Sequence, residues 1–257
     1  MKIALVSAYD FAYPGGVGNH ISALAYHFTK MGHEVQIIAP ASGVVSTFGA
    51  SFIPIGRPWP FPGSGSIARV TLSPWLSFRV KAVLDQGRYD IIHLHEPLCP
   101  TLCTTVLRLS HMANVGTFHA VDSRSYALSK PLAGLFLKRW FNKLDGRIAV
   151  SKSAMEFTNK YFPAEYTVIP NGVDLEHFSP TILPIDEYND GKINILFVGR
   201  LEKRKGLNYL LEAYAKVKRE VSKLRLIIVG PRTRWSNKYE KQARLKDHLH
   251  PRDIGLV

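Results

Sequence analysis

Short apolar, β-branched runs alternate with segments of helical periodicity, and this alternation restricts the fold more than any other feature of the chain. A helix is predicted over residues 17–31, because Val17, Ile21 and Phe28 share one face and Gly32 follows as a helix terminator. Strands are predicted at residues 2–6, 34–39, 89–94, 115–119, 147–150 and 167–169. Strands that are apolar along nearly their whole length, with helices between them, are typical of a parallel sheet covered on both faces.

The alternation restarts after residues 179–191, a stretch with proline and aspartate that is typical of a linker. Strands are predicted at residues 193–199, 224–229 and 253–257, and helices at 206–221 and 235–249. We therefore predict an α/β fold with an N-terminal Rossmann-like domain at 1–180, a linker at 181–191 and a C-terminal domain at 192–257. Two or three strands leave much of a sheet uncovered, so the second domain is expected to be incomplete.

Composition narrows the partners and the location. The chain has 257 residues and a formal net charge of +13, so we expect anionic partners such as nucleotide diphosphates or an anionic lipid surface. Nucleic acid is not expected, because no recognition helix, zinc finger or aromatic-basic stacking pattern is present. No apolar run suits a membrane span or a signal peptide, which predicts a cytoplasmic protein. Cys99 and Cys103 lack companion ligands, so we interpret them as buried thiols and expect no metal.

Three segments depart from the alternating pattern. Residues 40–66 are rich in Gly, Pro and Ser and predict one long functional loop. Residues 76–84 and 130–141 mix cations with large apolar side chains. Each of these two suits either a helix lying on an anionic membrane or a core-packed helix with a charged outer face, and both interpretations stay open.

A glycine-rich turn follows the first predicted strand and opens the first predicted helix. Gly15, Gly16 and Gly18 let backbone N–H groups approach a phosphate or a sugar, and a helix N-terminus favours negative charge. The spacing departs from the dinucleotide fingerprint, and the second strand ends without an acid for an NAD ribose. The turn therefore predicts a phosphate or sugar site rather than an NAD site.

Histidines lie at the carboxyl ends of two predicted strands. His95 and Glu96 follow one strand, and we interpret them as residues that order neighbouring loops, with substrate binding as the alternative. His119 ends the next strand, at the sheet edge where open α/β sheets bind ligands. An imidazole there can bind a sugar hydroxyl or stabilise developing positive charge, so we predict a functional role for His119.

A basic turn lies between the strand and the helix of the second series. Arg200 and Lys205 flank it, and both can bind a diphosphate beside a helix N-terminus. When a bond at a sugar carbon breaks, the leaving diphosphate gains negative charge. Fixed cations at that place stabilise the transition state without a metal.

Taken in order, four motifs resemble those of the retaining GT-B glycosyltransferases of family 4. They are the glycine turn, His119 in Thr-Phe-His, the Ile-Pro-Asn-Gly-Val-Asp run at 169–174, and Gly-Arg at 199–200 with Lys-Gly at 205–206. The sequence at 65–69 and the His-Leu-His-Glu-Pro segment at 93–97 are similar to the phosphatidylinositol mannosyltransferase subgroup, which uses GDP-mannose. The resemblance covers essentially the whole chain.

The resemblance implies two Rossmann-like domains, the first binding the acceptor and the second most of the nucleotide-sugar. It implies that His119 is catalytic and that the donor-binding residues are Gly15, Gly16, Arg200 and Lys205. It implies acceptor binding by Tyr9, Ser64, Ser66 and Arg69. Such enzymes retain anomeric configuration and use GDP-mannose as co-substrate without a cofactor or metal. Because the acceptor of this subgroup is a membrane lipid, the resemblance also implies a peripheral location at the inner face of the cell membrane.

The chain departs from the subgroup at several positions. Gly18, Ser64 and Ala120 stand where the lipid-using relatives carry glutamine, asparagine and threonine, so a different lipid or a small polyol is an alternative acceptor. The family's Glu-x7-Glu segment is missing, and a catalytically inactive fragment that binds only acceptor or membrane is a second hypothesis. A nucleotide-sugar epimerase or dehydrogenase is a third, which the absent dinucleotide fingerprint argues against.

Overall fold

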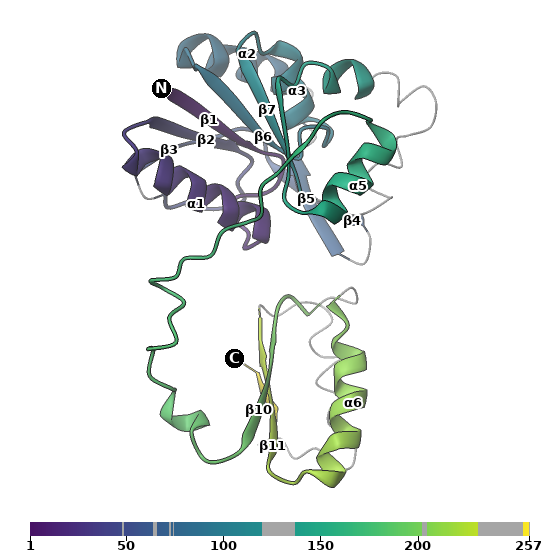
Figure 1. Ribbon diagram of the computed structural model, residues 1–257. Helices are drawn as coiled ribbons and strands as arrows, with labels where there is room; N and C mark the ends of the chain where they lie inside the picture. Colours follow the sequence, from purple (N-terminus) through teal and green to yellow (C-terminus); the bar gives the residue numbers. More distant parts are fainter. Residues whose placement is uncertain are drawn as a thin grey trace. The chain divides into compact units, whose positions relative to one another are not determined.

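The computed structural model divides the chain into two compact units, which are described separately. The first comprises Met1–Gly63 and Ile67–Gly172, and the second comprises Ser64–Ser66 and Val173–Val257 (Figure 1). The structure describes residues 1–47, 49–63, 66–71, 73, 75–119, 137–201, 205–230 and 254–256. The predicted helix at 235–249 lies outside these residues, as does most of the segment at 130–141.

The first unit is built on a seven-stranded parallel sheet with the order β3-β2-β1-β6-β7-β8-β9. The strands are β1 (Lys2–Ser7), β2 (Glu34–Ala39), β3 (Ser51–Pro54), β6 (Ile91–His95), β7 (Ala113–Phe118), β8 (Gly146–Ala149) and β9 (Thr167–Val168). The chain runs outward from β1 through β2 and β3, then returns to pair β6 with the other side of β1. This reversal of strand order between β1 and β6 is where doubly wound sheets bind ligands, beyond the carboxyl ends of the strands.

Helices cover both faces of this sheet. They are α1 (Gly16–Lys30), α2 (Leu76–Gly87), α3 (Leu102–Leu109) and α5 (Lys152–Tyr161) (Figure 1). Successive side chains of β1 point to opposite faces of the sheet, so alternate residues pack into different hydrophobic cores. Ile3 and Leu5 pack with Ile21 of α1. On the opposite face Ala4 and Val6 share a core with residues of α2 and α3. The predicted sheet with two covered faces is confirmed.

The prediction of a single long loop over residues 40–66 is wrong. This segment contains β3 and β4 (Pro58–Gly63) and the first residue of β5 (Ser66–Thr71), and β4 and β5 form a separate two-stranded sheet. Prolines suggested a loop because they cannot donate a backbone hydrogen bond. Here they occupy alternate positions, at Pro58, Pro60 and Pro62, so their missing N–H groups all fall on one edge of β4.

The second unit has three parallel strands in the order β10-β11-β12. They are β10 (Ile193–Val198), β11 (Leu224–Val229) and β12 (Ile254–Leu256), and helix α6 (Leu207–Glu220) packs against them. A 3-10 turn, η1 (Asp186–Tyr188), precedes β10. The buried Tyr214 hydroxyl of α6 donates to the Leu224 carbonyl at 3.0 Å and so fixes the helix to β11. No helix in the described parts of the chain is long and apolar enough to cross a membrane.

Helix α2 packs into the core through Leu76, Val80 and Leu84, which confirms the interpretation of a core-packed helix with a charged outer face. Its outer face also carries two large aromatic residues near its start. Trp75 is 71% exposed and Phe78 is 73% exposed, and their ring centroids lie 6.3 Å apart. Neighbouring large aromatic side chains that are exposed together often mark a surface that binds a partner or a membrane.

Candidate functional site

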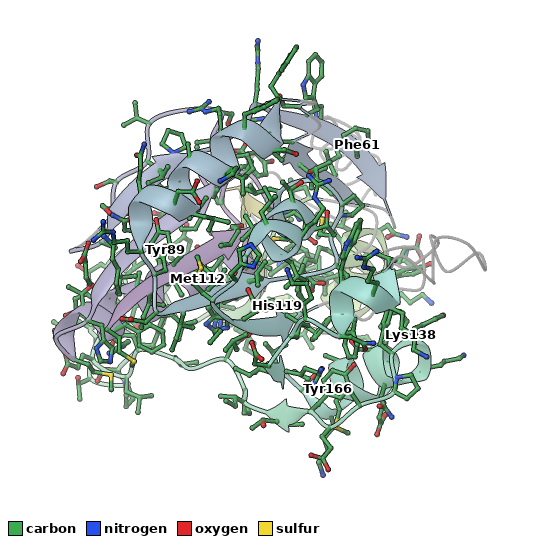
Figure 2. The ribbon with its side chains drawn as sticks, turned by 90° about the horizontal axis from the view of Figure 1, so that it is seen from above. Phe61, Tyr89, Met112, His119, Lys138 and Tyr166 are labelled. Atoms are coloured by element: carbon green, nitrogen blue, oxygen red, sulfur yellow. The ribbon has the colours of Figure 1, made fainter. Side chains whose placement is uncertain are left out.

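Four histidines gather on one face of the sheet in the first unit, at the reversal of strand order. In parallel strands, paired residues face the same side, and His93 and His95 pair with Leu5 and Ser7 of β1. They therefore lie on the face that α1 covers. His119 follows the last residue of β7 (Figure 2). His20 reaches the cluster from α1. The cluster thus joins three segments that are far apart in the sequence.

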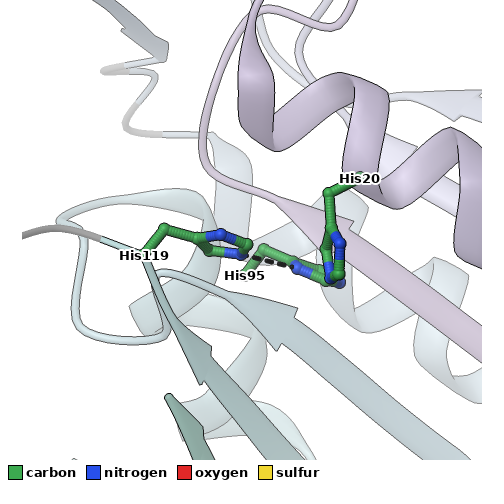
Figure 3. A group of neighbouring side chains, drawn as sticks. All are labelled: His20, His95 and His119. Atoms are coloured by element: carbon green, nitrogen blue, oxygen red, sulfur yellow. Dashed lines mark hydrogen bonds between the residues drawn. The ribbon is translucent and has the colours of Figure 1, made fainter. Parts of the chain in front are cut away.

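The imidazoles are in direct contact with one another. His95 Nδ1 and His119 Nε2 lie 3.1 Å apart and share a hydrogen bond (Figure 3). The His20 ring meets both edge-on, with centroid distances of 5.4 Å to His95 and 5.2 Å to His119. His93 stacks on His95 at 4.5 Å and hydrogen bonds through Nε2 to the Thr117 hydroxyl at 2.7 Å. The position of the His119 ring is therefore set by neighbours on both β6 and α1.

Glu96 orders the backbone around His119. Its carboxylate accepts a hydrogen bond from the His119 backbone N–H at 2.7 Å, and its own N–H donates to the Thr117 carbonyl at 2.9 Å. Glu96 is buried and has a φ of 58°, a left-handed conformation that costs a non-glycine residue about 1–3 kcal/mol. The interpretation of Glu96 as a residue that orders neighbouring loops is confirmed by these contacts.

Burial keeps the histidine cluster uncharged. Desolvation, followed by repulsion from His20, lowers the pKa of His93 to about 4. Desolvation and then the charges of His20 and His93 lower the pKa of His119 to about 4. The pKa of His95 falls well below its ordinary value, mainly through burial, and burial also lowers the pKa of His20. Near neutral pH the four rings are neutral imidazoles, which can both donate and accept hydrogen bonds.

The predicted glycine turn lies beside this cluster. Gly15 caps α1 and Gly16 is its first residue. Gly16 and His20 are four residues apart on α1, so they share the helix face that meets His119. The first N–H groups of a helix have no partner within it and can bind an anion. The structure thus brings the predicted donor-binding glycines to the same end of the sheet as His119.

Two of the four predicted acceptor-binding residues also come together. Tyr9 forms an isolated antiparallel bridge with Val70, and the Asp10 N–H donates to the Arg69 carbonyl at 2.9 Å. The Arg69 guanidinium lies 4.3 Å from the centre of the Tyr13 ring, a cation–π contact that positions its charge. Ser66 is described only as a residue of β5, and Ser64 lies outside the described residues.

The predicted diphosphate pair belongs to the second unit. Arg200 follows β10, and Lys205 lies next to Gly206, which caps the N-terminus of α6. The Lys205 side chain folds toward Gly199, since its Cδ and Cε lie 3.9 Å from the position a Gly199 Cβ would occupy. Both cations therefore flank the same strand-to-helix turn. That they face His119 stays a prediction.

The sequence motifs coincide with two known family models. Residues 14–177 match the model described as Glycosyltransferase Family 4, and residues 180–253 match Glycosyl transferases group 1. The chain belongs to glycosyltransferase family 4. The first match takes in the glycine turn and the whole histidine cluster, and the second takes in the basic turn.

Several curated family members are similar over most of the chain. Proteins named phosphatidyl-myo-inositol mannosyltransferase are 33% identical in Propionibacterium freudenreichii, 37% in Mycobacterium leprae and 36% in Mycobacterium tuberculosis. They match 91%, 90% and 90% of this chain. The chain spans 62%, 61% and 60% of their respective lengths.

Solved structures support the fold. Sucrose-phosphate synthase from Thermosynechococcus elongatus matches with a TM-score of 0.73 at 17% identity, covering 100% of this chain and 70% of its own. WaaG, a glycosyltransferase involved in lipopolysaccharide biosynthesis, matches with a TM-score of 0.63 at 13% identity, covering 99% and 69%. The predicted α/β fold of the GT-B type is confirmed.

The sequence motifs do not predict the cluster as a unit. His20 closely follows the glycine-rich turn, and His93 belongs to the His-Leu-His-Glu-Pro segment. The available signal was the pairing of His93 and His95 on alternate positions of one strand, which places both on the same sheet face. The pairing of β6 with β1, on the face that α1 covers, is a feature of the tertiary structure, and the spacing of residues in the sequence does not predict it.

Proposed function

We propose that this family 4 chain forms part of a retaining glycosyltransferase that transfers mannose from GDP-mannose to phosphatidylinositol. The observation that carries the proposal is the 33–37% identity, over about 90% of the chain, to proteins named phosphatidyl-myo-inositol mannosyltransferase. The geometry of the first unit adds to it, because a preorganised imidazole lies beside a helix N-terminus at the reversal of strand order.

The proposed chemistry assigns a separate task to each group. The N-terminus of α1 at Gly15 and Gly16, together with Arg200 and Lys205, would stabilise the negative charge of the leaving diphosphate. His119 would bind a hydroxyl of the donor sugar. As a neutral imidazole it does not repel the positive charge that develops on the sugar ring as the bond to phosphate breaks. Its fixed orientation, through His95 and Glu96, keeps the reorganisation cost low.

The acceptor would lie near Tyr9 and Arg69. An inositol phosphate head group carries negative charge and hydroxyls, which suit a guanidinium held over an aromatic ring. The exposed Trp75 and Phe78, followed by Arg79 and Lys81, support attachment to an anionic membrane that holds the acceptor. A location at the inner face of the cell membrane is part of the same proposal.

The proposal is tested by measuring mannose transfer from labelled GDP-mannose to phosphatidylinositol in vesicles. The assay uses the chain alone and the chain joined to the C-terminal part of the Mycobacterium leprae relative that it does not cover. His119→Ala is expected to lower transfer on the order of 10²–10³-fold, the usual effect of removing one preorganised hydrogen bond to the transition state. His111→Ala, which alters an exposed histidine of the same unit, is the matched control.

Full transfer in His119→Ala would refute the catalytic role of this residue. Binding of phosphatidylinositol vesicles without transfer, in both proteins, would instead support the hypothesis of an acceptor-binding fragment. Transfer to a soluble polyol but not to the lipid would refute the lipid acceptor and leave the donor assignment standing.

A further inference from the structure

Three of the clustered histidines have the arrangement of a metal site. One ring nitrogen from each of His20, His95 and His119 lies within 4.8 Å of the other two. These rings come from α1, from the end of β6 and from just beyond β7, and they lie next to one another (Figure 3). We propose that His20, His95 and His119 form a binding site for a divalent transition-metal ion of the zinc class.

The distances suit such an ion. Zinc–imidazole bonds of about 2.0–2.1 Å in a tetrahedral site hold ligand nitrogens roughly 3.3 Å apart. His95 Nδ1 and His119 Nε2 are already 3.1 Å apart. His20 would close the site by a small rotation of its side chain. It is partly exposed, and its ring makes edge contacts with both partners.

The chemical state of the rings favours coordination. Metal ions bind the neutral imidazole, and burial keeps these three rings neutral. His95 is completely buried, and its Nε2 has no hydrogen-bond partner in the described part of the chain. The His93 ring stacks on His95 and so helps to hold the His95 ring in position.

The donor set also selects the ion. Three imidazoles without a carboxylate suit zinc, copper, nickel or cobalt, whereas magnesium and calcium require oxygen ligands. His20 and His119 remain partly exposed, which leaves a fourth position for water or an anion. Three protein ligands with one open position are typical of reactive rather than purely structural zinc sites.

The site would regulate the proposed transfer, and this consequence rests on the proposed function. A metal ion held by His119 and its neighbours would place a positive charge and its own fourth ligand beside the ring that would bind the donor sugar. The ion and the nucleotide-sugar would therefore compete, so zinc would inhibit transfer and chelation would restore it. Metal binding is measured in the absence of the nucleotide-sugar. A chain that does not bind metal can therefore be distinguished from a chain that does not transfer sugar.

The test is a titration of the tag-free, chelator-treated chain with Co²⁺, followed by the visible absorption of four-coordinate cobalt. One equivalent is expected to bind and to be displaced by Zn²⁺. His20→Asn is expected to weaken binding at least tenfold, since even the loss of groups that merely support a ligand costs on the order of 10–100-fold. His27→Asn removes an exposed histidine two turns along the same helix and is the matched control.

A second variant and a second measurement keep the outcome decisive. His119→Asn replaces His20→Asn if circular dichroism shows that the latter has not folded, and zinc X-ray absorption counts the imidazoles on the ion in the unaltered chain. Two or three imidazole ligands, with binding lost in the cluster variants alone, support the site. Absence of four-coordinate cobalt, or equal binding by the parent, the cluster variants and His27→Asn, would overturn it.

Discussion

Replacing His93 with glutamine tests whether the buried histidines make the first unit sensitive to acid. The His93 pKa is about 4 in the folded chain and near 6.5 when the chain is unfolded. Between these values the unfolded state binds more protons, so the free energy of unfolding falls as the pH falls. The contribution is fully present above pH 6.5, is lost progressively down to about pH 4, and does not change further below that.

The size of the effect follows from the two pKa values. The full shift corresponds to about 3 kcal/mol, of which about 2 kcal/mol is lost between pH 7 and pH 5. The groups that face His93 within the cluster are His20 and His95, with Thr117 as its hydrogen-bond partner. Because both histidines are also held neutral, the parent chain is expected to lose more than this amount in total.

The assay is urea unfolding of the parent and of His93→Gln at pH 7 and pH 5, with a chelator present and tryptophan fluorescence as the signal. Glutamine keeps a polar group near Thr117, but unlike the imidazole of His93 it does not bind a proton in this pH range. The loss of stability between the two pH values should be about 2 kcal/mol smaller in His93→Gln than in the parent. His27→Gln, on the exposed side of α1, should behave like the parent. An equal loss in the parent and in His93→Gln would refute the reasoning.

Two further predictions concern packing and the membrane. Gly56→Ala should lower the free energy of unfolding by about 2–4 kcal/mol, because Gly56 has a φ of +82° and a Cβ there would lie within van der Waals overlap of the buried Thr71 side chain. Gly172→Ala has open space and should change stability by less than about 0.5 kcal/mol in the same denaturation assay, so equal effects would contradict the argument. Replacing Trp75 and Phe78 together with serine should reduce flotation with anionic vesicles several-fold while leaving the unfolding transition unchanged. Unaltered flotation would show that Trp75 and Phe78 do not contribute to vesicle binding.

Most of the fold could be predicted because the parallel strands are almost wholly apolar. The strands Glu34–Ala39 and Leu224–Val229 begin and end as predicted, and helix α1 differs from its predicted limits by one residue at each end. The β4–β5 sheet could not be predicted from propensity, because three prolines in six residues argue against a strand unless their alternation is considered.

The candidate site could be predicted only in part. His119 stood out because it follows a strand at the ligand-binding edge, and the structure brings it to α1 as expected. The neighbours that determine its chemistry could not be found in the same way. The sequence predicts for His95 only a role in ordering neighbouring loops. Its contact with His119 depends on the register between β6 and β7, which pairs His95 with Thr117.

The proline spacing in β4 has a consequence for what this protein can bind. Pro58, Pro60 and Pro62 lie at alternate positions and so leave one edge of β4 with carbonyl acceptors but no N–H donors at these positions. An incoming extended peptide would find no donor for its own carbonyls, so neither a foreign strand nor a second copy of the chain can continue the sheet from this side. The exposed side chains of Trp59 and Phe61 lie between these prolines, so β4 can offer apolar surface to solvent without offering that edge for strand pairing.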